Sequence, residues 1–335
     1  MAIFQNEKTY FFLETPEGRG AIAVISVWGR GAKTTVETFF TPKLTENWKN
    51  SVPGKVVYGE IQAEDVLVCP TGQGGVEIHC HGSMAAVRRI MNLLQLAGAE
   101  AMDSEHFGEL QGWTPVQRRV MEWLPYATTW KTTRILWEQF HGALERAWEK
   151  GEDTQRWQGI ADHLIQPWKV VLAGRPNVGK SSLFNAILGF ARAIVHTEAG
   201  TTRDVLSERT VLEGWNVEFF DSAGLHATEN PVEQVGIRRA QQEIQEADLV
   251  LWIRDVTAGV DEEKFPLKTS GKLLTVWNKR DEAKPPYPTL SVSAKTGEGI
   301  PQLLKTIVRT LIPQEPPPGT GIPILPCEKD RPSNI

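Results

Sequence analysis

A run of polar and small residues near the middle of the chain, residues 174–181, has the sequence GRPNVGKS and could bind phosphate. Two glycines separated by four residues and followed by lysine and serine are typical of loops whose backbone N–H groups surround a phosphate at a helix N-terminus. Lys180 would reach the β- and γ-phosphates, and Ser181 would offer its hydroxyl to the Mg²⁺ that bridges them. This motif predicts a bound nucleoside triphosphate and leaves the base open.

A second polar motif, residues 278–281 with the sequence NKRD, follows the apolar run LLTVW. Asp281 could accept hydrogen bonds from N1 and N2 of guanine, whereas adenine has no 2-amino donor. An unpaired buried carboxylate costs roughly a few kcal/mol, so this residue would select GTP over ATP. Ser293, Ala294 and Lys295 follow the run TLSV and would add a backbone N–H for guanine O6.

A third motif, residues 221–224 with the sequence DSAG, follows the run VEFF and is predicted to contact Mg²⁺ and the γ-phosphate. Leu225 comes next, where Ras-like proteins carry the glutamine that orients the attacking water. Because leucine cannot hold water, Glu233 in the same segment is a candidate for that role. The alternative, favoured for an isolated glutamate, is a solvated surface carboxylate.

The elements that position these motifs are apolar runs that alternate with helical segments. The alternation predicts a parallel sheet with crossover helices, an α/β fold of the P-loop GTPase type, over residues 167–313. The runs expected to be strands cover residues 168–174, 216–224, 247–256, 272–279 and 289–294.

Three further parts are predicted from the pattern. Residues 1–102 carry β-rich runs separated by Gly and Pro and then a helix over 84–99 with Ser83 as N-cap, which indicates an α+β domain. Residues 103–166 are predicted to be a reduced helical segment, and residues 314–335, rich in Pro and Gly, are predicted to be disordered. In the helical segment, a core-facing row is expected at Trp137, Phe140, Leu144 and Trp148.

The composition of the chain excludes some classes of protein. The formal charge of −5 argues against a broad basic surface, so any RNA contact is expected to be local or assisted by a partner. The three cysteines form no C-x-x-C pair, which fits a reducing, cytoplasmic setting. No export signal and no membrane span are predicted. His79 and His81 are too few ligands for zinc, and we interpret them as strand residues.

Two regions of the chain resemble the MnmE/TrmE family of tRNA-modifying GTPases. In the C-terminal half the matching segments are GRPNVGKSSLFNAI, AIVHTEAGTTRD, DSAGL and VGIRRAQQEIQEADLVLWIRD. In the N-terminal half they are ETPEGRGAIAVI and VEIHCHG. Together these matches cover about two thirds of the chain.

The resemblance implies roles for individual residues of the GTPase part. Asn177 matches an asparagine that helps to bind K⁺, and residues 196–202 match the loop that closes over this ion. Thr202 matches the threonine that, with Ser181, binds Mg²⁺, and Glu233 matches the catalytic glutamate of the family. K⁺ would supply the charge that other GTPases take from an arginine finger, in a pair of associated GTPase domains. The K⁺ ligands expected are Asn177, His196, Glu198 and Thr201, of which His196 and Glu198 replace smaller or apolar residues.

Motifs and resemblance together give one set of candidate residues. Glu233 and Lys180 are predicted to be catalytic. The predicted nucleotide-binding residues are Asn177, Val178, Gly179, Lys180, Ser181, Ser182, His196, Thr197, Glu198, Ala199, Gly200, Thr201, Thr202, Asp221, Ser222, Ala223, Gly224, Asn278, Lys279, Arg280, Asp281, Ser293, Ala294 and Lys295.

The resemblance also implies a folate derivative in the N-terminal domain, a homodimer, a flavoprotein partner and tRNA as substrate. Glu77 matches a folate-contacting glutamate, whereas Ser26 stands where the family has arginine. The central N-G-K-x-D-L signature and the terminal Cys-x-Gly-Lys are not recognised, so a shortened member is expected. The leading hypothesis is a GTPase of wobble-uridine modification, and the alternative is a regulatory or assembly GTPase without that chemistry.

Overall fold

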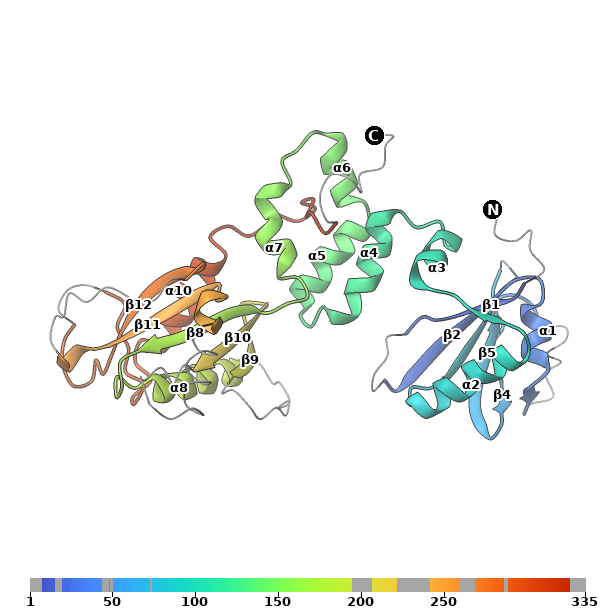
Figure 1. Ribbon diagram of the computed structural model, residues 1–335, viewed down its shortest axis with the longest axis horizontal. Coiled ribbons are helices and arrows are strands. Elements are labelled where there is room, and N and C mark those ends of the chain that lie inside the picture. Colours follow the sequence, from blue (N-terminus) through green and yellow to red (C-terminus); the bar gives the residue numbers. More distant parts are fainter. Residues whose placement is uncertain are drawn as a thin grey trace. The chain divides into compact units, whose positions relative to one another are not determined.

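The computed structural model of the chain describes residues 8–15, 20–43, 48, 51–72, 74–194, 207–221, 242–258, 269–285 and 289–325. The chain divides into two compact units, Met1–Pro125 and Tyr126–Ile335 (Figure 1). The first contains the predicted α+β domain, and the second contains the predicted P-loop fold.

The first unit is built on a seven-stranded sheet with the strand order β3-β4-β5-β6-β2-β1-β7. Neighbouring strands are antiparallel, except that β1 and β7 run parallel. The strands are β1 (Tyr10–Leu13), β2 (Ile22–Trp28), β3 (Phe40–Pro42), β4 (Val57–Ile61), β5 (Glu64–Pro70), β6 (Val76–His81) and β7 (Glu100–Ala101).

Helix α2 (Met84–Leu96) packs its apolar side onto this sheet. Ile90 and Leu94 are fully buried in the core with the strand residues Ile25 and Ile78. Ser83 caps the helix as predicted, because its side chain accepts a hydrogen bond from Ala86 N at 3.2 Å. The predicted end at residue 99 is wrong: the helix ends at residue 96, followed by Gly98 in the left-handed region (φ 87°).

The predicted helical segment 103–166 is divided between the two units. Helices α3 (Ser104–Leu110) and α4 (Pro115–Trp123) lie in the first unit, where Phe107 stacks on Phe12 of β1 with ring centroids 4.3 Å apart. This unit also contains helix α1 (Ala32–Glu37), and the turn η3 (Leu124–Tyr126) lies at the division between the units.

The second unit contains a five-stranded sheet with the order β12-β11-β8-β10-β9, in which all neighbours are parallel except β10 and β9. The parallel pattern is confirmed, and the antiparallel edge strand was not predicted. The strands are β8 (Trp168–Gly174), β9 (Ser207–Leu212), β10 (Trp215–Asp221), β11 (Leu249–Asp255) and β12 (Lys272–Asn278). The carboxyl ends of the parallel strands therefore carry Gly174, Asp221, Asp255 and Asn278.

Helices cover this sheet on both faces. Helix α8 (Lys180–Ile194) contacts strands β8 to β10, and helix α10 (Ile300–Leu311) contacts both α8 and β11. Against the other face, Ile244 and Ala247 pack with Val171, Ala173 and Val250 of the strands. The turn η5 (Val256–Ala258) follows β11.

The strand predicted over 289–294 is reduced to an isolated parallel bridge between Ser291 and Trp277. Trp277 N donates to Leu290 O at 3.0 Å, and Val292 N donates to Trp277 O at 2.7 Å. Pro285, Pro286 and Pro288 precede this stretch. Because proline has no backbone N–H, they limit the length over which it can pair.

The predicted core-facing row in the helical segment holds at Leu144, which is fully buried, and is wrong at Trp137. Helix α5 (Trp130–Phe140) ends before Gly142, whose φ is 83°, and α6 (Ala143–Glu149) begins after it, so the helical phase is broken. Trp137 is 48% exposed. The buried residues of α5 are Thr132, Ile135, Leu136 and Gln139, and the turn η4 (Gln155–Trp157) and α7 (Gln158–Asp162) complete the segment.

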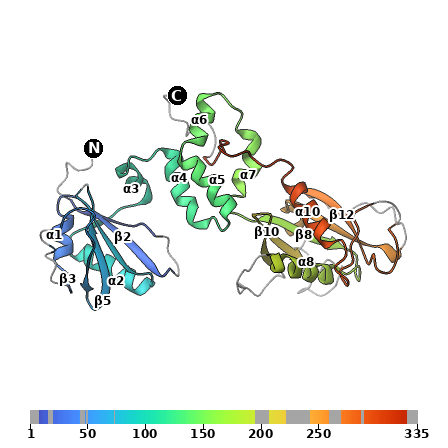
Figure 2. The ribbon, with the colours of Figure 1, turned by 180° about the vertical axis from the view of Figure 1, so that it is seen from behind.

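The prediction of disorder from residue 314 onward is also wrong for residues 314–325. After α10 the chain returns to α5 and α6 in an extended course that we call the strap, residues 315–324 (Figures 1 and 2). Ile322 and Ile324 are buried. A Cβ at Gly321 would lie 2.5 Å from Ala147 Cβ, so the strap lies directly on α6.

Hydrogen bonds from α5 fix the strap in register. The buried Gln139 amide donates from Nε2 to Thr320 O at 3.1 Å and accepts at Oε1 from Ile322 N at 3.0 Å. Glu315 pairs with Lys131 Nζ at 2.6 Å and accepts from Trp215 Nε1 of β10 at 3.2 Å. Tertiary contacts therefore order a segment whose local composition favours disorder. Residues 326–335 of the predicted tail lie outside the described residues.

Candidate nucleotide site

The phosphate-binding motif lies where the sequence places it, between β8 and α8. Asn177 and Gly179 have positive φ values of 60° and 87°, so the chain curls tightly between strand and helix. A Cβ at Gly174 would lie 2.5 Å from Ile253 O, and one at Gly179 would lie 2.5 Å from Asn278 Nδ2. Both glycines are therefore required by close approach of neighbouring groups, and at Gly179 the φ adds to this requirement.

Lys180, the first residue of α8, is buried inside this loop. Its ammonium donates to Gly174 O at 3.0 Å and to Arg175 O at 2.9 Å. Burial lowers the pKa of Lys180, while the nearby Asp221 acts in the opposite direction. The loop thus holds a cation at the helix N-terminus, where a phosphate would be stabilised.

Ser181, at the amino end of α8, meets Asp221, at the carboxyl end of β10. Ser181 Oγ donates to Asp221 Oδ2 at 2.5 Å. Asp221 Oδ1 is buried and has no hydrogen-bond partner among the residues that the structure describes. A buried carboxylate oxygen beside a hydroxyl oxygen is the kind of donor set that Mg²⁺ binds, so these residues fit the metal.

Asn278 fastens the predicted base-binding loops to the phosphate loop. Its buried side chain donates from Nδ2 to Val178 O at 2.9 Å and accepts at Oδ1 from Ala294 N at 3.0 Å. One amide therefore holds residues from three separate motifs together. The neighbouring Ser182 and Arg280 are exposed at the rim, where Arg280 pairs with Glu298 at 3.2 Å.

Asp281 is exposed and held in its charged form. A hydrogen bond from Ser293 keeps the pKa of Asp281 below its ordinary value, and Lys295 adds a smaller favourable charge. Ser293 is itself buried and accepts a hydrogen bond from Thr296 N at 3.0 Å. A fixed, ionised carboxylate at this position can accept the two N–H groups at the edge of a guanine base.

Lys279 lies between Asn278 and Asp281 with a left-handed backbone (φ 65°), and its ammonium pairs with Asp255 at 2.5 Å. Asp255 ends strand β11 and was missed by the sequence reading. The sequence could have identified Asp255 by its position immediately after the apolar run LVLWIR, at the carboxyl end of a parallel strand.

Several predicted residues lie outside the described residues, and no position is assigned to them. They are His196, Thr197, Glu198, Ala199, Gly200, Thr201, Thr202, Ser222, Ala223, Gly224 and Glu233.

Glu77, the predicted folate contact, lies in the first unit on the side of β6 that faces away from the core. Its carboxylate contacts His79 Nε2 at 3.1 Å, and its strand partner is Ser26 of β2. Ser26 in turn donates to Glu14, and burial raises the pKa of Glu14. These four residues therefore form a polar patch on this face of the sheet.

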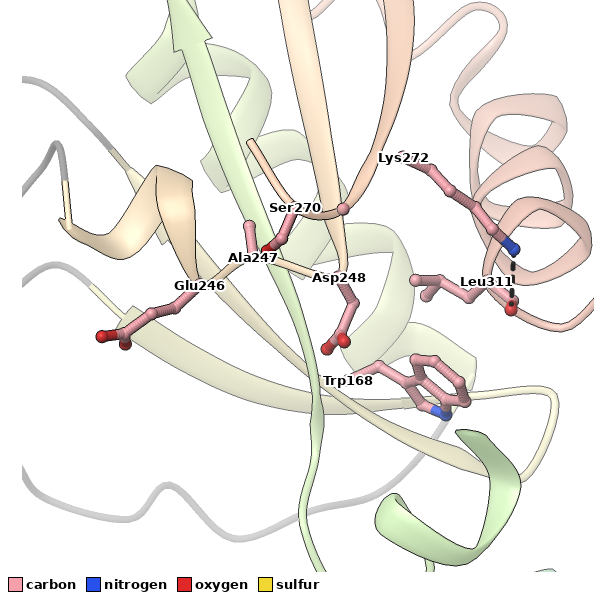
Figure 3. A pocket seen from close by; sticks show the side chains of 8 residues that line it. Trp168, Glu246, Ala247, Asp248, Ser270, Lys272 and Leu311 are labelled. Carbon is pink, nitrogen blue, oxygen red and sulfur yellow. Dashed lines mark hydrogen bonds between the residues drawn. The ribbon is translucent and has the colours of Figure 1, made fainter. Parts of the chain in front are cut away.

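In the second unit, a cavity of about 260 Å³ opens at the end of the five-stranded sheet opposite the nucleotide site (Figure 3). It is lined by Trp168 and Lys272, the first residues of β8 and β12, and by Asp248 just before β11. Lys272 Nζ donates there to Leu311 O at 3.3 Å. This cavity lies at the amino ends of the strands and is not part of the nucleotide site.

No helix in the described part of the chain is long and apolar enough to span a membrane.

Comparisons with known proteins point to one family. The description "GTP-binding protein TrmE N-terminus" matches residues 9–108, and "50S ribosome-binding GTPase" matches residues 169–279. The chain is 30% identical to the tRNA modification GTPase MnmE of Chlamydia pneumoniae, over 90% of this chain and 81% of the relative. It is also 30% identical to the MnmE of Protochlamydia amoebophila, over 93% of this chain and 81% of the relative.

Among solved structures, the chain is similar to Aquifex aeolicus Era bound to GDP.AlF4-. The identity is 27%, the TM-score is 0.35, and the match covers 44% of this chain and 57% of that chain.

Proposed function

The chain belongs to the family of the tRNA modification GTPase MnmE, and on this premise we propose that it hydrolyses GTP during modification of the wobble uridine of tRNA. The observation that carries the proposal is the single Asn278 side chain joining the phosphate loop to the base-reading loop, in a chain whose residues 9–108 match the TrmE N-terminus. A GTPase that acts only as a regulatory switch would not need this N-terminal domain.

The chemistry follows from the residues at the strand ends. The backbone N–H groups of the loop and Lys180 bind the phosphates, and Asp281 reads the base. Ser181 and Asp221, with Thr202, would hold Mg²⁺, which neutralises negative charge on the terminal phosphates when bound. Lys180 stabilises charge that develops on the transferred phosphoryl group because it is held in place before the reaction.

The proposed function is tested by mass spectrometry of tRNA nucleosides from a strain in which the gene is deleted. We expect the modified wobble uridine to disappear and to return when the gene is supplied again. The Asp281→Asn variant, which would no longer bind GTP, should not restore it. An unchanged nucleoside profile after deletion would contradict the role in tRNA modification while leaving GTP hydrolysis intact.

We further propose that K⁺ assists hydrolysis and that Glu233 orients the attacking water. Three observations support this: Asn177 has a left-handed backbone within the phosphate loop, Leu225 follows the DSAG motif, and the chain matches the family. The GTPase rate is expected to rise when K⁺ replaces Na⁺, because the larger ion suits a loop of backbone and amide oxygens beside the phosphates. Glu233→Ala should lower kcat by roughly a hundredfold with little change in GTP affinity. Equal rates in Na⁺ and K⁺ would refute the role of the ion.

We also propose that the first unit binds a folate derivative near Glu77 and forms a homodimer that works with a flavoprotein partner. The sheet face away from the core supports an interface, because Ile22, Tyr58 and Leu67 on it are 59%, 37% and 42% exposed. Apolar side chains gathered on one face are typical of association surfaces. Light scattering of the nucleotide-free chain checks this, and a monomeric mass would contradict it.

A further inference from the structure

Lys279 is held at both ends of its side chain. Its backbone takes the left-handed conformation, and its carbonyl accepts hydrogen bonds from Glu282 N at 2.8 Å and Ala283 N at 3.4 Å. Its ammonium, four methylenes away, lies 2.5 Å from Asp255 Oδ2. The aliphatic part of the side chain is therefore fixed, although a lysine side chain is ordinarily free to change rotamer.

Asp255 is in turn fixed before any ligand arrives. Its Oδ1 accepts hydrogen bonds from Thr257 N at 2.8 Å and from Thr257 Oγ1 at 2.7 Å, which leaves Oδ2 for Lys279. In the ladder between β11 and β12, Asp255 lies directly opposite Asn278. Although burial alone would raise the pKa of Asp255, the hydrogen bonds from Lys279 and Thr257 keep it below its ordinary value.

The position of Lys279 in the loop connects the Asp255–Lys279 pair with nucleotide binding. Asn278 is tied to Val178 of the phosphate loop, and Asp281 is tied to Ser293. A nucleotide that contacts both loops must therefore lie next to Lys279, which stands between Asn278 and Asp281 in the chain. A flat purine needs an apolar surface on its face as well as hydrogen bonds at its edge, and a fixed lysine stem offers four methylenes for this.

We propose that Asp255 is a positioning residue of the guanine site: it holds the Lys279 stem as a preformed wall for the base and thereby sets the affinity for guanine nucleotides. The proposal rests on the proposed GTPase function. Without Asp255, the stem would have to be ordered when the nucleotide binds, and this ordering would weaken binding. The phosphates and the attacking water are untouched, so the chemical step should not change.

The experiment compares Asp255→Asn with the unmodified chain. We expect the Kd for fluorescent GDP and the KM for GTP to rise about tenfold, with kcat at saturating GTP unchanged, since a half-buried, charge-assisted hydrogen bond is lost. The matched control is Glu298→Gln, which removes the neighbouring Arg280–Glu298 pair, exposed at the surface. This control should leave Kd and KM unchanged.

A double substitution separates positioning from general loosening of the fold. In a Lys279→Met background, Asp255→Asn should cause no further loss of affinity, because the group it positions is gone. An equal loss in both backgrounds, or an unchanged Kd in the single variant, would overturn the proposal. If Asp255→Asn fails to fold, Thr257→Ala, which only loosens Asp255, should raise Kd by a smaller factor, and no rise would likewise overturn it. Failure of the unmodified chain to bind GDP or GTP would instead contradict the proposed function.

Discussion

Replacing Asp281 with asparagine is expected to change the preferred base from guanine to xanthine. An amide would present an N–H donor where guanine also presents donors, but it would match the 2-carbonyl of xanthine. Because Asp281 is charged and fixed by Ser293, we expect GTP affinity to fall by about a thousandfold or more and XTP affinity to rise. Competition binding with GTP, XTP and ATP measures this.

The control for this change is Glu282→Gln at the next position, an exposed carboxylate whose backbone N–H donates to Lys279 O. That control should keep the preference for GTP. If the unmodified chain bound ATP and GTP equally, or if Asp281→Asn still preferred GTP, the assignment of the base-reading residue would be wrong.

Replacing Asp221 with asparagine should abolish most of the Mg²⁺-dependent GTPase activity. Among the described residues, one buried oxygen of the carboxylate has no hydrogen-bond partner and the other accepts from Ser181, so its negative charge is available to a cation. A neutral amide of the same shape removes that charge without emptying the space. We expect kcat to fall by roughly a hundred- to a thousandfold and the Mg²⁺ concentration for half-maximal rate to rise more than about tenfold.

Phosphate release measured over a Mg²⁺ titration checks this prediction. Glu218→Gln on the same strand is the control, because Glu218 pairs with Arg209 and Ser207 and not with the loop. An unchanged Mg²⁺ dependence in Asp221→Asn would rule out this residue as part of the metal site.

The nucleotide site could be predicted from sequence because its residues are contiguous in short motifs at strand ends. The run predicted at residues 168–174 is strand β8 in full, and in a parallel sheet the carboxyl ends of neighbouring strands meet at one edge. The partnership of Asp255 with Lys279 could not be predicted, since it depends on the register of β11 against β12. Register is a tertiary property that no local pattern in a continuously buried strand specifies.

The other errors have the same origin. The spacing of Trp137, Phe140, Leu144 and Trp148 predicts one core-facing row. Instead, α5 ends before Gly142 and α6 begins after it, so the two helices bury different faces, with Leu136 and Gln139 buried in α5 and Leu144 buried in α6. The composition of residues 314–325 indicates disorder when it is judged alone. The partners that order it belong to α5 and α6, more than 170 positions earlier in the chain, and local propensity carries no information about them.

The strap has a consequence for the order in which the protein can fold during synthesis. Gln139 meets Thr320 and Ile322, which are separated from it in sequence by 181 and 183 positions. At about 5–20 residues per second, the ribosome adds the missing partner roughly 9 to 36 s after α5 has been made. During that interval the α5–α6 pair lacks the side chains of Ile322 and Ile324, and the Gln139 amide lacks Thr320 O and Ile322 N as partners and keeps Ile135 O of its own helix. The five-stranded sheet, whose residues all lie in between, can form first, so the helical part of the second unit is completed last although its helices are synthesised first.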